Sequence, residues 1–338
     1  MSGKYRELSF AIRFSQTHKI DSVCQRRFKS PRGIVARLEV EQMSRSGFKL
    51  APEMSFGPVS LRVKDLSSML LFYEKELGLT AVRRDGDVVE LSPSEGRLPI
   101  LVLKHIPDLE KAPEASAGLY HYALLLPDRR SLAAAYLTIG NAGVVFDGYA
   151  DHLVSEALYL NDPEGNGIEI YADRPSSKWK FDEDGQVDMS TQPLDIDSLL
   201  KEVAGVPQDS LKALPEETRV GHIHLKVTDL QRSLSFYRTV LGLDLMRYYG
   251  SAAFLSVGRY HHHIGMNTWE SLGGKPVERN WAGLDYVTIT VPHANLDELS
   301  TILADSPIAH HVGNGELFIS DPDEIALIVK PSEQSHLI

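Results

Sequence analysis

The chain has 338 residues, 43% of them hydrophobic and 24% charged, which is typical of a globular protein with room for two domains. Its net charge of −11 disfavours nucleic acid as a partner, and it has no apolar run long enough for a membrane span or a secretory signal, so we expect a cytoplasmic protein. The single cysteine, Cys24, excludes an internal disulfide and a multi-cysteine zinc site, so a bound metal needs His and carboxylate ligands.

Residues 1–54 differ in composition from the rest of the chain. Residues 1–50 hold eleven Lys and Arg against four Asp and Glu. An Arg-rich organelle presequence is one interpretation, but such sequences usually avoid acidic residues. We therefore expect residues 1–54 to be a basic, disordered extension.

An internal repeat organises the rest of the chain. Residues 57–66 read GPVSLRVKDL and residues 221–230 read GHIHLKVTDL, and residues 57–79 match 221–243 at eleven of 23 positions. A second pair of segments begins at Gly118-Leu119 and Gly283-Leu284, and Asp162-Pro163 later matches Asp321-Pro322. We therefore divide the chain into four similar modules, at residues 57–112, 118–173, 220–278 and 281–332.

The first module shows the secondary structure that we expect in all four. Residues 59–63 predict a strand, and apolar residues then recur at helical spacing from Leu66 to Tyr73, until Gly78 ends the helix. Three further strands are predicted at 81–84, 88–91 and 100–103. The pattern is βαβββ, which makes an α+β fold. Between the halves lies a polar linker with one short helix predicted at 195–203.

Three phrases in the sequence point to a known family. They are DHLVSEALY at 151–159 with DPEGNGIE at 162–169, GHIH at 221–224, and HHHIG at 261–265. With the four modules, they make the chain similar to the vicinal oxygen chelate superfamily of glyoxalases, bleomycin resistance proteins and extradiol dioxygenases. Residues 57–332 resemble the two-domain catechol 2,3-dioxygenases. The resemblance implies two half-barrel cups, a first domain at 55–173, a linker at 174–219 and a second domain at 220–332.

The resemblance also implies a mononuclear Fe(II), with Mn(II) as an alternative, held by two His and one carboxylate from the first and last strands of modules. At those positions only three residues can bind iron in this way, and we predict His121, Glu169 and His224 as the metal ligands. His152 is a rival third ligand. The corresponding positions of the other modules are occupied by Ser60, Tyr286 and Ala326.

The predicted ligands come from the second and third modules. Family members commonly take all three from the two modules of one half of the chain, which here would be modules one and two or modules three and four. Neither of these two pairs has a complete set here. We therefore predict that modules two and three form the active cup, and that modules one and four form a metal-free cup. The long linker permits this crossing.

Ring cleavage also needs side chains that move protons and donate hydrogen bonds. By position in the family, we predict His263 as the acid/base, Tyr159 as the tyrosine ten residues before the ligand Glu169, and His152 as a histidine on the oxygen side. Taken alone, Tyr159 could equally be an aromatic residue of the core.

We therefore expect an extradiol ring-cleavage dioxygenase that opens a catechol-type ring with O2. Its partners are a small aromatic diol and O2, with no nucleic acid and no membrane, and the sequence leaves room for a homo-oligomer. One alternative is a glyoxalase-like metal-dependent isomerase or transferase, although segment 261–266 lacks the Glu that such an enzyme uses as a fourth ligand. A second alternative is a non-catalytic protein that binds a small aromatic ligand.

Overall fold

Two eight-stranded sheets, each curved into a half-barrel, form the body of the protein. The computed structural model describes residues 47–332 except residues 305 and 307. In spatial order, the first sheet contains β14 (His310–Gly313), β15 (Glu316–Ser320), β16 (Ala326–Pro331), β13 (Gly283–Val291), β1 (Ser55–Val63), β4 (Leu101–His105), β3 (Val88–Ser92) and β2 (Thr80–Asp85). The second contains β10 (Asp244–Tyr248), β11 (Ala252–Ser256), β12 (Ile264–Asn267), β9 (Arg219–Lys226), β5 (Gly118–Leu126), β8 (Gly167–Asp173), β7 (Ser155–Asn161) and β6 (Gly148–Asp151).

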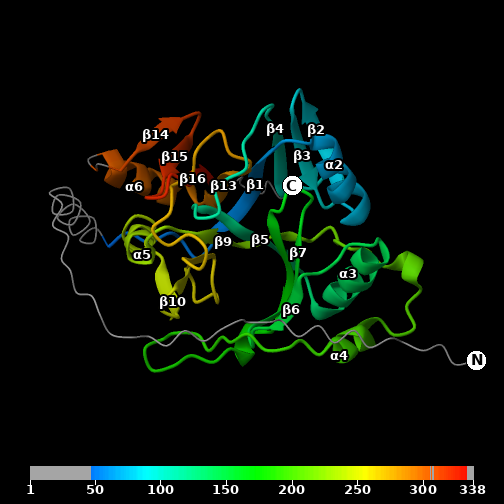
Figure 1. The fold of residues 1–338 in the computed structure, drawn as a ribbon. Coiled ribbons are helices and arrows are strands. Elements are labelled where there is room, and N and C mark those ends of the chain that lie inside the picture. The colour runs from blue at the N-terminus through cyan, green and yellow to red at the C-terminus, as the bar shows by residue number, and fades with distance from the viewer. Residues whose placement is uncertain (1–46, 305, 307, 333–338) are drawn as a thin grey trace, which may run out of the picture.

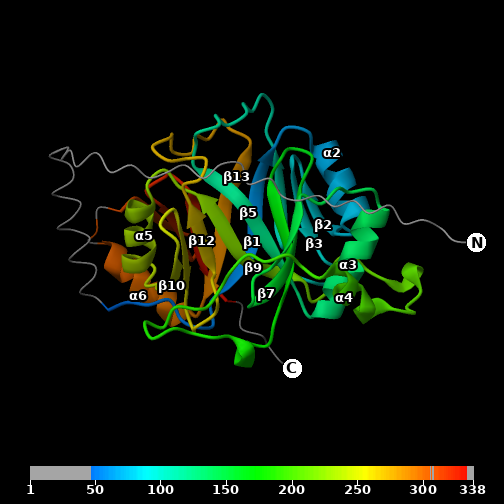
Figure 2. The same ribbon diagram turned by 60° about the horizontal axis from the view of Figure 1, so that its bottom comes forward.

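Each module contributes one helix between its first and second strands. These helices are α2 (Leu66–Leu70), which continues as the π-helical turn η1 (Leu71–Glu76), α3 (Arg129–Asn141), α5 (Leu230–Thr239) and α6 (His293–Ala304). The linker holds α4 (Ile196–Leu200) and three short turns, η2 (Ser176–Lys178), η3 (Lys201–Val203) and η4 (Gln208–Ser210). Helices α5 and α6 lie on one side of the strands, and α2, α3 and α4 on the other (Figure 2). No helix in the described part of the chain is long and apolar enough to cross a membrane.

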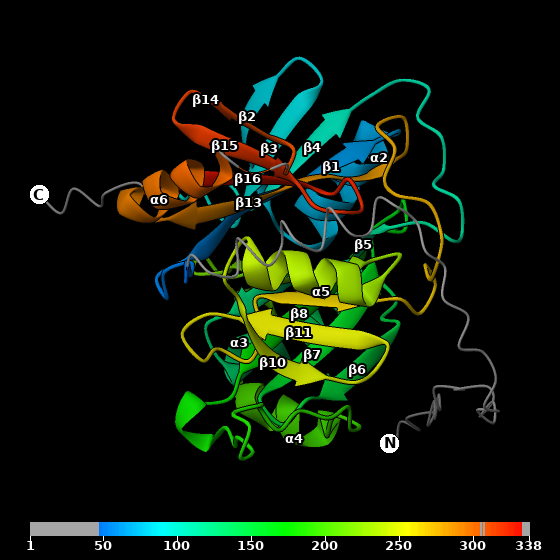
Figure 3. The same cartoon turned by 90° about the vertical axis from the view of Figure 1, so that its left-hand side faces the viewer.

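The modules are paired crosswise, as the sequence predicted. Strand β5 of module two pairs antiparallel with β9 of module three, and β1 of module one pairs antiparallel with β13 of module four. In Figure 1 the blue and cyan first module therefore lies beside the orange and red fourth, and Figure 3 shows the two sheets one above the other. Each sheet draws on both halves of the sequence, so neither sheet corresponds to residues 55–173 or 220–332 alone.

Buried Tyr-Asp hydrogen bonds tie the two sheets together. Tyr73 of module one donates to Asp162 of module two at 2.9 Å, and Tyr237 of module three donates to Asp321 of module four at 3.1 Å. Tyr73 and Tyr237 occupy matching positions of the repeat, and so do Asp162 and Asp321. The hydrogen bonds therefore join module one to module two and module three to module four, whereas the sheets pair module two with three and module one with four.

Residues 47–54, which we had assigned to the basic extension, pack against the folded body. Phe48, Leu50 and Met54 are buried, and the Leu50 amide donates to the Leu241 carbonyl at 3.1 Å. Asn295 of α6 donates to the Lys49 carbonyl. The boundary at residue 54 was thus placed too late, because burial of these apolar side chains outweighs the polar character of the surrounding segment. The expectation of disorder for residues 1–46 lies outside the described residues.

The buried carboxyl of Asp321 makes stability depend on pH. Burial raises its pKa to about 7, above the value in the unfolded chain, so the folded state holds this proton more tightly. The resulting stabilisation is complete below the unfolded-state pKa and is lost as the pH rises through about 7. We expect the free energy of unfolding, measured by urea denaturation, to fall between pH 5 and pH 8, and Asp321→Asn to flatten this dependence. Equal pH slopes for the two proteins would contradict the assignment.

Candidate metal centre

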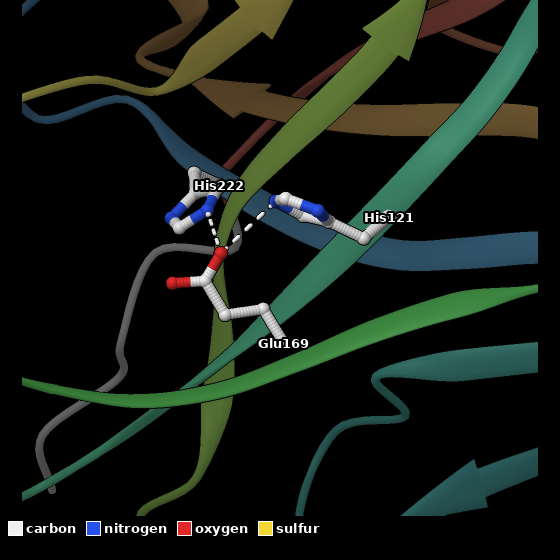
Figure 4. Close-up of side chains that lie close together, drawn as sticks. All are labelled: His121, Glu169 and His222. Atoms are coloured by element: carbon white, nitrogen blue, oxygen red, sulfur yellow. Dashed lines mark hydrogen bonds and ion pairs between the residues drawn. The ribbon is translucent and has the colours of Figure 1, made fainter. Parts of the chain in front are cut away.

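Three buried side chains meet on adjacent strands in the middle of the second sheet. They are His121 on β5, Glu169 on β8 and His222 on β9, with exposures of 7%, 3% and 1%. The Glu169 Oε2 atom lies 3.0 Å from His121 Nε2 and 3.1 Å from His222 Nε2 (Figure 4). One donor atom from each residue lies within 4.8 Å of the other two.

The sheet register and a glycine allow this close approach. Strand β5 lies between β8 and β9, and Tyr122, beside His121, pairs with Ile168, beside Glu169. A Cβ atom at Gly167 would lie 2.2 Å from the Tyr120 carbonyl oxygen. Only glycine therefore lets β8 approach β5 at this point, which explains the second glycine of the EGNG turn.

Electrostatics leave Glu169 and His222 in the protonation states that metal ligands require. Burial alone would raise the pKa of Glu169, but the imidazoles of His222 and His121 hold this pKa well below its usual range. Burial lowers the pKa of His222 to about 4, although Glu169 acts in the opposite direction. At neutral pH the site thus offers a carboxylate at Glu169 and a neutral imidazole at His222.

An unpaired nitrogen atom shows that this group fits a metal ion. His121 Nε2, which faces Glu169, is buried without a hydrogen-bond partner. The 3.0 Å contact of His121 Nε2 with Glu169 is an ion-pair distance but lacks the direction of a hydrogen bond. A buried nitrogen without a partner is costly unless something else is bound there, and two His with one carboxylate suit a divalent first-row metal.

His224, the predicted third ligand, lies outside this group. Its ring is 4.9 Å from that of His121, but its Nε2 atom lies 3.0 Å from Asn267 Nδ2, and it forms part of a cavity wall. A better alignment was available in the sequence. Asp128 and Asp229 cap the following helices, and counting back seven residues from them reaches His121 and His222.

A cavity of about 1120 Å³ opens beside the His-Glu-His group. His121 and Glu169 line it, together with Tyr159, His152 and His262. The aromatic side chains of Tyr120, Tyr249, Phe254 and Trp269 also line it. His222 is enclosed next to His262, with 4.1 Å between the ring centres. Residues 188–191 of the linker form one side of the cavity, so this segment belongs to the site.

Tyr159 and His152, two of the predicted site residues, line the cavity, and they are hydrogen-bonded to each other. The Tyr159 hydroxyl and His152 Nε2 are 2.7 Å apart, and His152 Nδ1 lies 3.0 Å from the Ser190 carbonyl oxygen. Both ring nitrogens of His152 thus have partners, which disfavours the alternative that His152 is a metal ligand. Burial raises the pKa of Tyr159 well above its ordinary value, so its hydroxyl keeps the proton.

His263, the predicted acid/base, does not line the cavity, whereas His262 does. His263 Nδ1 lies 2.7 Å from Ser256 Oγ, and its ring packs on Tyr260. The prediction assumed that residues 261–263 lie in a strand, but β12 begins only at Ile264. His262 Nδ1 contacts His261 Nδ1 at 2.8 Å, and His261 Nε2 contacts Asp173 at 2.8 Å.

The first sheet has no equivalent group among the described residues. Tyr286 occupies the position in β13 that His121 has in β5. Two residues further on, Thr288 of β13 pairs with Ile328, whereas Ala123 of β5 pairs with Glu169. Ile328, rather than Ala326, therefore occupies the position of the carboxylate. Within the described residues, His121, Glu169 and His222 form the one group with metal-site geometry.

Comparisons with known proteins agree with this fold. A family model described as the glyoxalase/bleomycin resistance protein/dioxygenase superfamily matches residues 55–170 and 219–328. A Bacillus subtilis protein named catechol-2,3-dioxygenase is 43% identical over 240 residues, which cover 70% of this chain and 82% of that protein. Among solved structures, the cppA protein of Streptococcus pneumoniae has a TM-score of 0.54 at 11% identity, covering 84% of this chain and 100% of that chain. A mutant glyoxalase I from Zea mays has a TM-score of 0.50 at 15% identity, covering 86% and 96%.

Alanine substitutions of His222 and His224 should show which of these histidines binds the metal and which only lines the cavity. We expect about one divalent metal ion per chain in the wild type, and loss of this ion from His222→Ala, because a ligand is removed. His224→Ala is the matched control, and it should weaken binding by no more than the roughly 10- to 100-fold typical of an outer contact. Metal content after dialysis, measured by mass spectrometry, checks this. Retention by His222→Ala with loss from His224→Ala would restore His224 as the ligand.

Proposed function

The chain belongs to the glyoxalase/bleomycin resistance protein/dioxygenase superfamily, and we propose that it is an extradiol dioxygenase that opens a catechol-type ring with O2 at a mononuclear Fe(II). The observation that carries this proposal is the buried group of His121, Glu169 and His222 beside a cavity with aromatic walls. The relative named catechol-2,3-dioxygenase supports it. The substrates would be a small aromatic diol and O2.

His121, Glu169 and His222 would hold the metal. When bound, Fe(II) supplies Lewis acidity toward the two diol oxygens and one-electron redox chemistry, and the same ligands also suit Mn(II). A set of three protein ligands leaves positions for small molecules. Strand β12, which reads IGMN, contributes no fourth carboxylate, and this disfavours the isomerase alternative.

We assign the acid/base role to His262 in place of His263. The Asp173 carboxylate accepts a hydrogen bond from His261 Nε2, so the neutral His261 ring has a lone pair at Nδ1. His262 must then donate its Nδ1 proton to His261, and His262 Nε2 remains free to accept a proton in the cavity. Burial lowers the pKa of His262 well below its ordinary value, which keeps this nitrogen unprotonated.

Tyr159 would accept a hydrogen bond from a hydroxyl of the diol, because its own proton is donated to His152 Nε2. Tyr159 pairs with Glu169 across β7 and β8, so its side chain lies next to the metal group. The Ser190 carbonyl accepts from His152 Nδ1, and His152 Nε2 is therefore an acceptor that orients the Tyr159 hydroxyl. The linker thus helps to position both residues.

The test of the function is ring opening by the Fe(II)-loaded protein. With a panel of substituted catechols in air, we expect a yellow ring-opened semialdehyde and consumption of one O2 per ring, measured by absorbance and an oxygen electrode. Colourless products together with glutathione-dependent turnover of methylglyoxal would support an isomerase instead. Tight catechol binding without any turnover would support a binding protein.

Substitution of the two adjacent histidines tests the acid/base assignment. His262→Ala should keep the metal and lower kcat by about 100- to 10,000-fold, the usual contribution of general acid–base catalysis. His263→Ala is the control, because His263 lies outside the cavity wall, and it should change kcat by much less. Metal content and steady-state kinetics of both variants check this. The reverse order of effects would return the role to His263.

A further inference from the structure

Asp173, at the end of β8, is the branch point of a hydrogen-bond network behind the candidate metal centre. Its Oδ1 atom lies 2.8 Å from His261 Nε2, and its Oδ2 atom accepts from the Tyr260 hydroxyl at 2.9 Å. We propose that Asp173 is a positioning residue that holds both the acid/base His262 and the metal ligand His222, although it lies outside the cavity wall. The inference rests on the function proposed for the same site.

The first branch leads through His261 to His262. His261 is 0% exposed, so both of its ring nitrogens need partners inside the protein. Asp173 is the partner of Nε2, and His262 Nδ1, at 2.8 Å, is the partner of Nδ1. Without the acceptor at Asp173, the neutral His261 ring would carry its proton on Nδ1. His262 would then have to accept at Nδ1 and carry its own proton on Nε2, where it could no longer take one from a substrate.

The second branch leads through Tyr260 to Tyr171, which packs on His222. Tyr260 donates its one hydroxyl proton to Asp173, so the Tyr171 hydroxyl donates to Tyr260, at 2.8 Å. The ring centres of Tyr171 and His222 are 4.8 Å apart. A Cβ atom at Gly221 would lie 1.9 Å from the Tyr171 hydroxyl, so the missing side chain next to His222 makes room for it. Tyr171, held at its hydroxyl, therefore supports the His222 imidazole.

The aromatic residue beside both branches cannot take over the role of Asp173. Trp179 of the linker lies edge-on to both rings that Asp173 binds, 5.2 Å from His261 and 5.6 Å from Tyr260 between ring centres. Its indole Nε1 atom is a donor only, and it already donates to main-chain carbonyls. Removal of the Asp173 carboxylate would therefore take away the acceptor that both branches share.

The position of the His262 proton tests the first branch without a measurement of activity. It can be observed by NMR of the ¹⁵N-histidine-labelled protein loaded with Zn(II), which is diamagnetic, with His262→Gln to identify the signals. We expect wild-type His262 to be protonated at Nδ1 and bare at Nε2. Asp173→Leu, which fills the space without an acceptor, should move this proton to Nε2. Tyr260→Phe is the matched control, because it removes the other hydrogen bond to Asp173 and should leave the His262 proton on Nδ1.

Kinetics and metal affinity separate the two branches. Asp173→Leu at saturating Fe(II) should lower kcat by about 100- to 10,000-fold with little change in KM, because His262 Nε2 no longer accepts a proton. Tyr260→Phe should lower kcat by much less. Both variants should bind the metal about 10-fold more weakly, the lower end of the range for outer contacts, because each releases the Tyr171 hydroxyl from its place.

Four results would overturn the proposal. They are a His262 proton on Nε2 in the wild type, an unchanged proton position in Asp173→Leu, a shift in Tyr260→Phe as large as that in Asp173→Leu, and metal affinity unchanged in both variants. Should Asp173→Leu fail to fold, His261→Phe decides, because it removes the acceptor of the His262 Nδ1 proton, and an unchanged proton position there also overturns the proposal. If the proton and the metal affinity change as expected but the Fe(II)-loaded wild type opens no catechol, the role of Asp173 in positioning stands and the dioxygenase proposal fails.

Discussion

The antiparallel pairing of β5 with β9 is the contact on which the candidate site depends. His121 and His222 belong to different halves of the sequence, and this pairing alone places their strands side by side. Glu169 reaches them from β8, which pairs with β5 on its other edge. A buried carboxylate is costly without partners, and here the two imidazoles provide them. The pairing of β5 with β9 therefore both assembles the site and provides the partners that stabilise the buried Glu169 carboxylate.

Crosswise pairing also explains why the linker is part of the site. A chain that pairs modules two and three must cover the distance between them, and residues 174–219 do so. Within this linker, residues 188–191 line the cavity. The segment is fixed by backbone hydrogen bonds between Gln192 and Asp151 and between Val187 and Met246. Its Ser190 carbonyl then orients His152. The linker, which the crosswise pairing requires, therefore also forms part of the cavity wall and contacts His152.

Sequence analysis predicted the modules, the crosswise pairing and two members of the His-Glu-His group, because repeats and apolar periodicity report directly on strands and helices. Its choices of His224 and His263 differ by one or two positions from His222 and His262, which the structure places beside Glu169 and on the cavity wall. His224 was chosen by aligning the strands from their first residues, whereas the helix-capping Asp229 fixes the position of His222. His263 was chosen by assuming a regular strand, but residues 261–263 precede β12, so alternation does not apply. The polar linker gave no sign that it would line the cavity, since its contacts are long-range and largely made by the backbone.

The first sheet keeps the module architecture without a His-Glu-His group among the described residues. A carboxylate at the Ile328 position would be buried there with neither a metal nor an imidazole partner. Exchange of that carboxylate for isoleucine removes the cost, and Ile328 and Thr288 then form an ordinary strand pair. The Tyr237–Asp321 hydrogen bond between modules three and four is present as well, because it ties one sheet to the other whether or not a metal is bound. Packing thus accounts for the repeat in both sheets, whereas a His-Glu-His group occurs in only one of them among the described residues.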